Sequence, residues 1–176
     1  KEKGRLRNYF HIGTGNYNSN TSRFYTDIGL LSTDPDISSD LIELFNYLSG
    51  FSKQKTYQKL LVSPTSLRKK FIFLINREIE NAKKGKKSEI IAKMNSLVDP
   101  EIIQLLYLAS QTGVKIYLII RGICCLYPQR KNLSENITVI SIIGHFLEHS
   151  RIFWFYNNND SEVFIGSADW MRRNLD

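Results

Sequence analysis

The sequence predicts an α/β layered domain in which helices flank a mixed sheet. The main observation is that residues 89–120 read as strand, helix and strand, which is a β-α-β unit. Such a unit takes a right-handed crossover and pairs its strands in parallel. Hydrophobic residues form 42% of the 176 residues and charged residues 23%, values that argue against a disordered chain. The longest candidate for a membrane span, Val114–Ile120, is far too short to be one.

The N-terminal elements follow from local patterns. Residues 8–13 suit a strand, and the small residues of Gly13-Thr14-Gly15-Asn16 end it. A loop should follow. Asp34-Pro35 then begins an amphipathic helix whose apolar residues recur at helical spacing until Gly50.

A second, longer helix is predicted to open at Ser63-Pro64-Thr65. Its apolar stripe ends in the lysine cluster of residues 83–87, which contributes to the formal net charge of +7. We expect this cluster to be a solvated helix end capped by Gly85 rather than a binding patch.

The β-α-β unit should contain a strand at 89–94, a helix at Pro100–Gln111 and a strand at 114–120. Polar residues between Gly50 and Leu60 interrupt the apolar pattern, so we place a domain boundary there, dividing residues 1–55 from 56–176. Three more short strands are expected at residues 137–142, 151–156 and 162–165.

An internal repeat carries the chemistry. Phe10-His11-Ile12-Gly13-Thr14-Gly15-Asn16-Tyr17 is echoed by Val163-Phe164-Ile165-Gly166-Ser167-Ala168-Asp169-Trp170. In both copies glycine lets an anion approach the backbone, the hydroxyl can bond a phosphate oxygen, and Asn or Asp can orient an imidazole. Either copy alone could also be simple turn chemistry.

A histidine precedes the second copy, in His149-Ser150-Arg151. The pairing of His-x-basic with a downstream Gly-Ser resembles the phospholipase D superfamily, in which two such half-sites face each other. The aspartate usual soon after the basic residue is absent, because residues 156–159 are Tyr and three Asn. This departure weakens an ordinary phosphodiesterase interpretation.

Longer stretches of the sequence indicate one family within that superfamily. Seven blocks, in order along nearly the whole chain, resemble the ATP-dependent polyphosphate kinase family. They are His11–Asn18, Phe24–Asp27, Ile91–Asp99, Arg121–Cys125, Leu133–Ile137, Leu147–Arg151 and Gly166–Met171. The resemblance implies a phospholipase D-like domain at residues 56–176, truncated at its C-terminus and preceded by the tail of a similar domain at 1–55.

The resemblance implies that Tyr25, Arg121 and His149 contact the nucleotide or the phosphoryl group in transit. His149 can exchange a proton with the departing ADP oxygen. Arg121 ends an apolar strand, where ligands gather in α/β folds, and its guanidinium can hold two phosphate oxygens. Tyr25 could stack on a base or bond a phosphate.

Further candidates for binding phosphate are Lys93, Asn95, Arg151 and Ser167, of which Lys93 and Asn95 follow from their place near a strand end. A solvated loop lysine is the ordinary alternative for Lys93. Thr14 and Asn16 are expected to support the first half-site.

The family implies reversible transfer of the terminal phosphate of ATP to inorganic polyphosphate through a phosphohistidine, with ADP as co-product. The nucleophilic histidine is expected before Lys1, so these 176 residues alone should be inactive. Magnesium is expected to shield the phosphates, with its principal contacts upstream and no metal ligand in this chain. The full-length protein is expected to form a homo-oligomer in the cytoplasm. Peripheral association with the inner face of the membrane is the alternative location.

Two alternatives remain open from the residues. One is a phospholipase D-like phosphodiesterase or nuclease. The other is a noncatalytic basic module that binds polyanions, motivated by the charge of +7. Such a module should interleave basic and exposed aromatic residues on one face. The candidate phosphate blocks instead cluster at strand ends, so no specific nucleic acid partner is expected.

Overall fold

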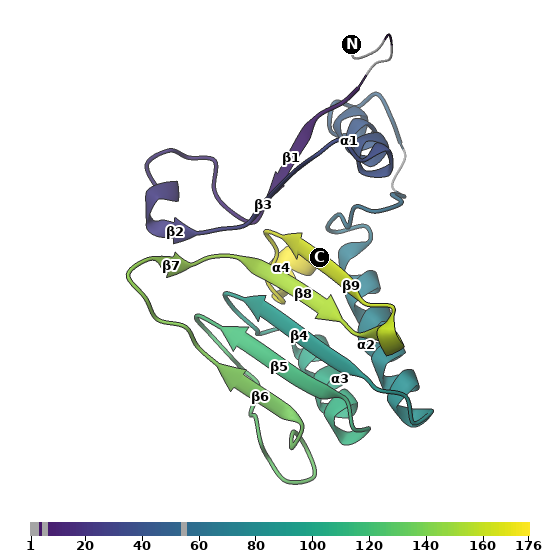
Figure 1. Cartoon of the computed structure of the whole chain (residues 1–176), viewed down its shortest axis with the longest axis vertical. Coiled ribbons are helices and arrows are strands. Elements are labelled where there is room, and N and C mark those ends of the chain that lie inside the picture. The colour runs from purple at the N-terminus through teal and green to yellow at the C-terminus, as the bar shows by residue number, and fades with distance from the viewer. Residues whose placement is uncertain (1–3, 5–6, 54–55) are drawn as a thin grey trace.

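The centre of the molecule is a five-stranded mixed sheet with the strand order β6-β5-β4-β8-β9 (Figure 1). The computed structural model describes residues 4, 7–53 and 56–176. Strands β4, β5 and β6 run parallel, β8 is antiparallel to β4, and β9 is antiparallel to β8. Their bounds are β4 (Glu89–Met94), β5 (Lys115–Ile120), β6 (Ile137–Ile140), β8 (Arg151–Phe155) and β9 (Glu162–Gly166). The predicted mixed sheet is confirmed: β4 has its predicted bounds, and each of the other four strands is shifted at one end by one or two residues.

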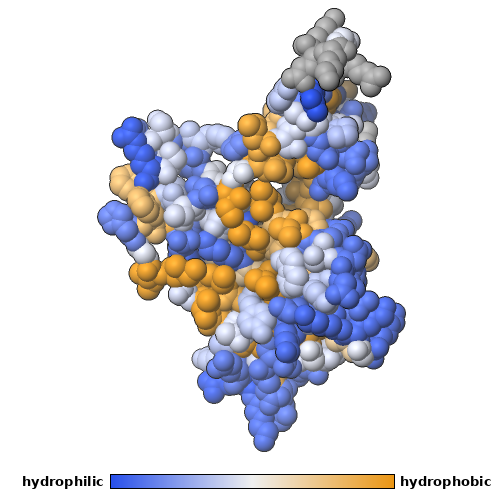
Figure 2. Space-filling model, in the orientation of Figure 1, coloured by the Kyte–Doolittle hydropathy of each residue, from blue (hydrophilic) through white to orange (hydrophobic). Residues whose placement is uncertain are grey.

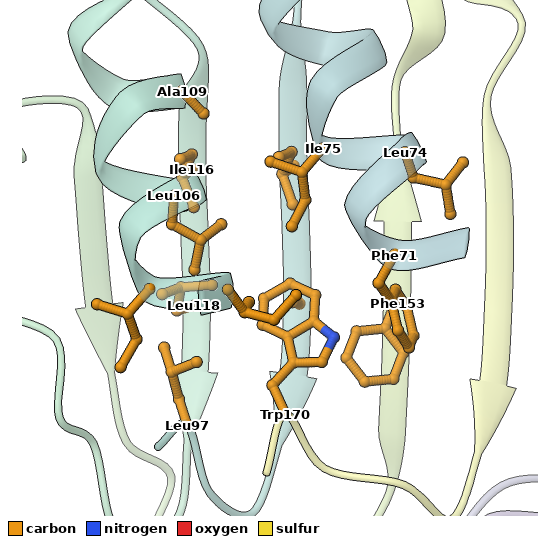
Figure 3. Packing of buried hydrophobic residues seen from close by; sticks show 14 of the residues in the cluster. Phe71, Leu74, Ile75, Leu97, Leu106, Ala109, Ile116, Leu118, Phe153 and Trp170 are labelled. Atoms are coloured by element: carbon orange, nitrogen blue, oxygen red, sulfur yellow. The ribbon is translucent and has the colours of Figure 1, made fainter. Parts of the chain in front are cut away.

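Helices α2 (Leu67–Lys83) and α3 (Pro100–Gln111) pack side by side over one face of this sheet (Figure 3). Trp170, fully buried, lies between them and the strands and contacts the rings of Phe71 and Phe153 at centroid distances of 5.6 and 5.2 Å. Side chains alternate along β4, so Ala92 faces the helices while Lys93 points to the opposite face.

Helices α2 and α3 start differently. Helix α3 has its predicted bounds, because Asp99 caps it by accepting a hydrogen bond from Ile102 N–H at 3.0 Å. The prediction that α2 opens at Ser63-Pro64-Thr65 was wrong, since α2 begins at Leu67. In residues 63–66 the hydroxyl groups of Thr65 and Ser66 bond backbone atoms of Val62, which holds this stretch in turns.

The end of α2 confirms the expected helix end and the glycine that follows it. The helix ends at Lys83, and Gly85 follows with φ of +70°, a left-handed conformation that glycine adopts without steric cost. Residues 83–87 are exposed. They form a solvated helix end.

The N-terminal part contains a two-stranded antiparallel ladder of β1 (Phe10–Gly13) and β3 (Gly29–Ser32), followed by α1 (Pro35–Leu48). The loop between the strands holds a 3-10 turn at Ser22–Phe24 and then β2 (Tyr25–Thr26). The sequence did not predict β2 or β3, which are too short or too weakly patterned.

Strand β2 pairs in parallel with β7 (Leu147–Glu148), on the arm between β6 and β8 (Figure 1). This small sheet joins the N-terminal part to the arm and was also not predicted. The expected domain boundary near residue 55 stays a prediction, and residues 54 and 55 lie outside the described part. A 3-10 turn at Asn157–Asn159 and helix α4 (Arg172–Leu175) complete the elements. No helix among the described residues is long and apolar enough to cross a bilayer.

Candidate active site

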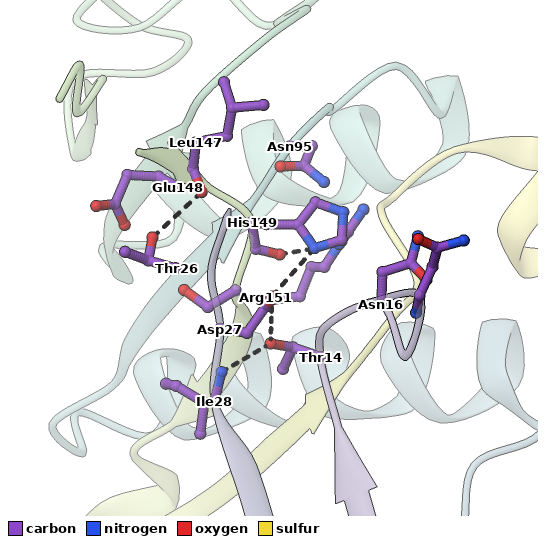
Figure 4. Close-up of polar contacts among 12 residues, drawn as sticks. Thr14, Asn16, Thr26, Asp27, Ile28, Asn95, Leu147, Glu148, His149 and Arg151 are labelled. Carbon is purple, nitrogen blue, oxygen red and sulfur yellow. Dashed lines mark hydrogen bonds and ion pairs between the residues drawn. The ribbon is translucent and has the colours of Figure 1, made fainter. Parts of the chain in front are cut away.

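His149 stands directly after β7, and the pairing of β7 with β2 decides what surrounds it. Its backbone N–H donates to the carbonyl of Thr26 at 3.1 Å, which extends the β2–β7 ladder by one residue. Tyr25 and Asp27, two positions apart along the extended chain, therefore reach the imidazole together. Figure 4 shows His149 facing Asp27 across the two segments.

The imidazole of His149 is held on its edge and on one ring face. Nδ1 lies 3.1 Å from Oδ1 of Asp27, and the Tyr25 ring stacks at a centroid distance of 4.5 Å and an interplanar angle of 19°. The side chains of His149 and Asp27 are 20% and 23% exposed. Because a carboxylate only accepts, it places a proton on Nδ1 and leaves Nε2 free to exchange a proton with a ligand.

Arg151 covers the imidazole from another direction. Its Nη1 lies 3.2 Å from Nδ1 and 3.1 Å from Nε2 of His149. An atom nearly equidistant from both ring nitrogens at this range must sit over the ring face, since an in-plane position would overlap a ring carbon. The contact is therefore a cation over a π face. The same Nη1 donates to the carbonyl of His149 at 2.9 Å.

Asp169 fixes the rest of the Arg151 guanidinium. Its carboxylate accepts from Nε at 3.1 Å and from Nη2 at 3.3 Å, and it also accepts from the backbone N–H of Asn95 at 2.8 Å. Both side chains are less than a tenth exposed. Within the second repeat copy, the acid thus orients the arginine. The imidazole is oriented instead by Asp27, from the other part of the chain.

The Lys93 ammonium is paired with side chains of the protein. Its ammonium donates to Oε2 of Glu148 at 2.6 Å and also to the hydroxyl of Ser150. The ammonium is the main cause of a lowered pKa of the Glu148 carboxyl, which the Thr26 hydroxyl lowers further, while partial burial opposes both. In this structure Lys93 ties β7 to the central strand β4.

Arg121 and Asn95 lie side by side just beyond the carboxyl ends of β5 and β4, whose register pairs Met94 with Ile120. Asn95 is 6% exposed, and its Oδ1 has no hydrogen-bond partner among the described residues. Nη1 of Arg121 is likewise buried without a partner there. Buried polar atoms are rarely left unpaired, so both are candidates to contact a ligand at this edge of the sheet.

The remaining predicted residues differ in how they join the cluster. Thr14 is fully buried, and its hydroxyl donates to Asp27 Oδ1 at 3.4 Å. Asn16 is exposed, and its side-chain oxygen accepts from the N–H of Asn18 at 2.9 Å, a turn contact. Ser167 is exposed beside Gly166, the register partner of Arg151.

Ser167 also lines a mainly apolar cavity of about 690 Å³ between β1, α1, β9 and the start of α2. Figure 2 shows hydrophobic side chains gathering at the middle of this view, between the N-terminal part and the sheet. This cavity is distinct in character from the polar cluster around His149.

Asp27 is the functional candidate that the sequence reasoning missed. It lies 122 residues from His149, so no spacing in the sequence links the two. The available signal was its place two residues after Tyr25 in the block Phe24–Asp27, which puts both side chains on one side of an extended strand.

Comparisons with known proteins agree on one family. A model described as "Polyphosphate kinase C-terminal domain 2" matches residues 60–176, and one described as "Polyphosphate kinase C-terminal domain 1" matches residues 1–54. A polyphosphate kinase of Prochlorococcus marinus (strain MIT 9313) is 69% identical over all 176 residues, which cover 25% of that protein. One of Pseudomonas aeruginosa is 51% identical over 176 residues, 26% of its length.

Among solved structures, the crystal structure of polyphosphate kinase from Porphyromonas gingivalis superposes with a TM-score of 0.88 at 43% identity. The match covers 94% of this chain and 27% of that one. The chain therefore spans about a quarter of the length of the relatives it matches.

Proposed function

This chain belongs to the polyphosphate kinase family, and we propose that it supplies one side of an active site that reversibly transfers the terminal phosphate of ATP to inorganic polyphosphate. The observation that carries the proposal is the His149 cluster. The imidazole of His149, whose Nδ1 faces a carboxylate, contacts Arg151, and Asp169 joins Arg151 to the backbone of Asn95. Beside Asn95, at the carboxyl edge of the parallel strands, Arg121 has a buried nitrogen without a partner among the described residues. Such an arrangement suits proton exchange beside a bound phosphate.

The proposed chemistry has two steps. First, an imidazole nitrogen of a histidine elsewhere in the longer protein attacks the γ-phosphorus of ATP; a nitrogen–phosphorus bond forms and the bond to the ADP oxygen breaks. Nε2 of His149, when protonated, donates its proton to that departing oxygen. In the second step a terminal oxygen of polyphosphate attacks the phosphohistidine, the nitrogen–phosphorus bond breaks, and Nε2 takes up the proton of the attacking group.

The other side chains have supporting roles in this proposal. Arg121 holds phosphate oxygens, because its buried Nη1 is unused by the described residues. Tyr25 lies face to face with His149, so we assign it to holding the imidazole and lining the phosphate position rather than to stacking on a base. Arg151 keeps the imidazole in place from a buried pair with Asp169.

Magnesium belongs to the proposal as a counter-charge for the phosphates. Among residues 4, 7–53 and 56–176, no group of three His, Cys, Asp or Glu side chains could hold a metal ion. Near His149, the carboxylates of Asp27 and Asp169 already accept from the imidazole and from Arg151. These residues do not form a metal site, so no step is assigned to a metal here.

The test uses the full-length kinase that contains this chain and ATP labelled on the terminal phosphate. We expect acid-labile, base-stable label on the protein and transfer to polyphosphate. His149→Ala should slow transfer by about 10²- to 10⁴-fold, the range for losing a general acid–base group. The matched control is His145→Ala, an exposed histidine four residues away whose ring contacts Phe146.

The outcomes separate the parts of the proposal. Absence of protein-bound label in the active wild type would exclude the covalent intermediate. If His149→Ala turned over as fast as His145→Ala, His149 would have no catalytic role. Release of inorganic phosphate from ATP without growth of polyphosphate would instead indicate a hydrolase.

A further inference from the structure

We propose that Thr14 and Gly15, from the first repeat copy, form a cradle that positions Asp27 and thereby sets the tautomer of His149. The sequence assigned this copy to the first half-site. The contacts assign it to the histidine of the second. The catalytic consequence rests on the proposed function, whereas the positioning itself can be measured without any activity.

Gly15 provides the space for the Asp27 carboxylate. A Cβ atom at position 15 would stand 2.2 Å from Oδ2 and 2.4 Å from Cγ of Asp27, far inside van der Waals contact. Glycine is therefore required here because the carboxylate packs against the backbone. By contrast, a Cβ at Gly166, the matching glycine of the second copy, would meet nothing within 4 Å. The two copies are not equivalent.

Thr14 holds the same carboxylate from its other side. Its backbone N–H donates to the carbonyl of Ile28 at 2.9 Å, which continues the β1–β3 ladder one pair past Gly13 and Gly29. Its buried hydroxyl accepts from the N–H of Ile28 at 3.1 Å and faces Asp27 Oδ1 at 3.4 Å. Since the N–H of Ile28 fixes the hydroxyl oxygen, the hydroxyl proton is left to point at Asp27.

The Thr14 hydroxyl and the His149 imidazole converge on one oxygen. Oδ1 of Asp27 lies 3.1 Å from Nδ1 of His149 and 3.4 Å from the Thr14 hydroxyl (Figure 4). Because Oδ2 packs against the backbone of Gly15, the carboxylate is held in one orientation. Among the described residues, a carboxylate turned away would leave the imidazole with Tyr25 and Arg151, which stack on its faces and select no tautomer.

The first experiment reads the tautomer of His149 by long-range nitrogen–carbon NMR of the 176-residue chain. We expect a proton on Nδ1 in the wild type and loss of that preference in Gly15→Ala. Gly144→Ala is the matched control, because the nearest atom to its added Cβ is a carbonyl oxygen at 3.9 Å. His11 and His145 are internal references that should not change.

The second pair of variants isolates the hydroxyl and needs no added bulk. Thr14→Ser should keep the Nδ1 tautomer, and the nearly isosteric Thr14→Val should weaken it. An unchanged His149 tautomer in Gly15→Ala with native spectra elsewhere would overturn the role of Gly15. An unchanged tautomer in Thr14→Val would overturn that of Thr14, even if Gly15→Ala failed to fold.

A kinetic cycle in the full-length kinase tests whether the cradle acts through Asp27. We expect Asp27→Asn to lower kcat about 10²-fold or more with KM for ATP within about twofold, as for a lost orienting carboxylate. Gly15→Ala should also lower kcat, but should add less than about twofold in the Asp27→Asn background. Additive losses would mean that Gly15 acts on general stability instead. If the wild type had no kinase activity, the proposed function would fail while the tautomer result would still stand.

Discussion

Replacing Lys93 with Met should loosen the arm that carries His149. The Lys93 ammonium, on the central strand β4, donates to Glu148 at 2.6 Å and holds β7 against the sheet. Strand β7 pairs with β2 over only two residues, so the ladder by itself holds the arm weakly. Lys93→Met keeps the aliphatic stem but leaves the Glu148 carboxylate without its main partner. The expected effect is local opening of the β2–β7 pair.

The magnitude follows from the exposure of the pair. The side chains of Lys93 and Glu148 are 13% and 23% exposed, between a surface pair worth up to about 1 kcal/mol and a buried one worth several. We expect the loss of the pair to lower the free energy of opening the β2–β7 pair by about 1–2 kcal/mol, which raises the opening equilibrium constant roughly 5- to 30-fold. The assay is amide hydrogen exchange at His149, whose N–H donates to Thr26. This amide should exchange faster by that factor in Lys93→Met.

The pH dependence has a definite sign. The pKa of Glu148 is lowered by Lys93, so the stabilisation is fully present above the ordinary glutamate pKa of about 4.3 and is lost as the pH falls through the lower folded-state value. The matched control is Lys115→Met, an exposed lysine on β5. Equal exchange at His149 in the wild type and Lys93→Met, at neutral pH, would refute the idea that Lys93 anchors the arm.

Three further predictions concern stability. Leu74→Ala should cost about 2–5 kcal/mol in urea unfolding, because Leu74 is fully buried in the core. Arg68→Met should cost about 2–3 kcal/mol by the same assay, because it leaves the Asp99 carboxylate, 2% exposed, without its cation. The control is Arg172→Met, at an 88% exposed side chain, which should cost under about 0.5 kcal/mol. Burial raises the pKa of the Asp40 carboxyl, but hydrogen bonds from the backbone N–H groups of residues 58–60 outweigh burial, so the pKa is lowered. The protection of those amides from hydrogen exchange should therefore fall as the solution is acidified below about pH 4.

The sequence predicted the large elements because each carries its own local signal. Pro100–Gln111 is bounded by an Asp-Pro start and a glycine two residues after its end, and the structure has it unchanged. The site depends on contacts with no local signal. Strand β2 is two residues long and takes its partner from 122 positions away. For that reason Tyr25 and His149 were assigned to the site through family resemblance, and their direct stacking was not foreseen.

Charge pairing in the cluster indicates where an incoming anion meets the protein. Arg151 is paired with Asp169 and Lys93 with Glu148, so binding phosphate to either would require breaking a pair that is mostly removed from water. Arg121 differs, because its buried Nη1 lacks a partner among the described residues. A phosphate oxygen placed there satisfies an unpaired donor instead of displacing an acceptor. Arg121 should therefore be the first anchor for phosphate, with Arg151 and Lys93 keeping His149 in position.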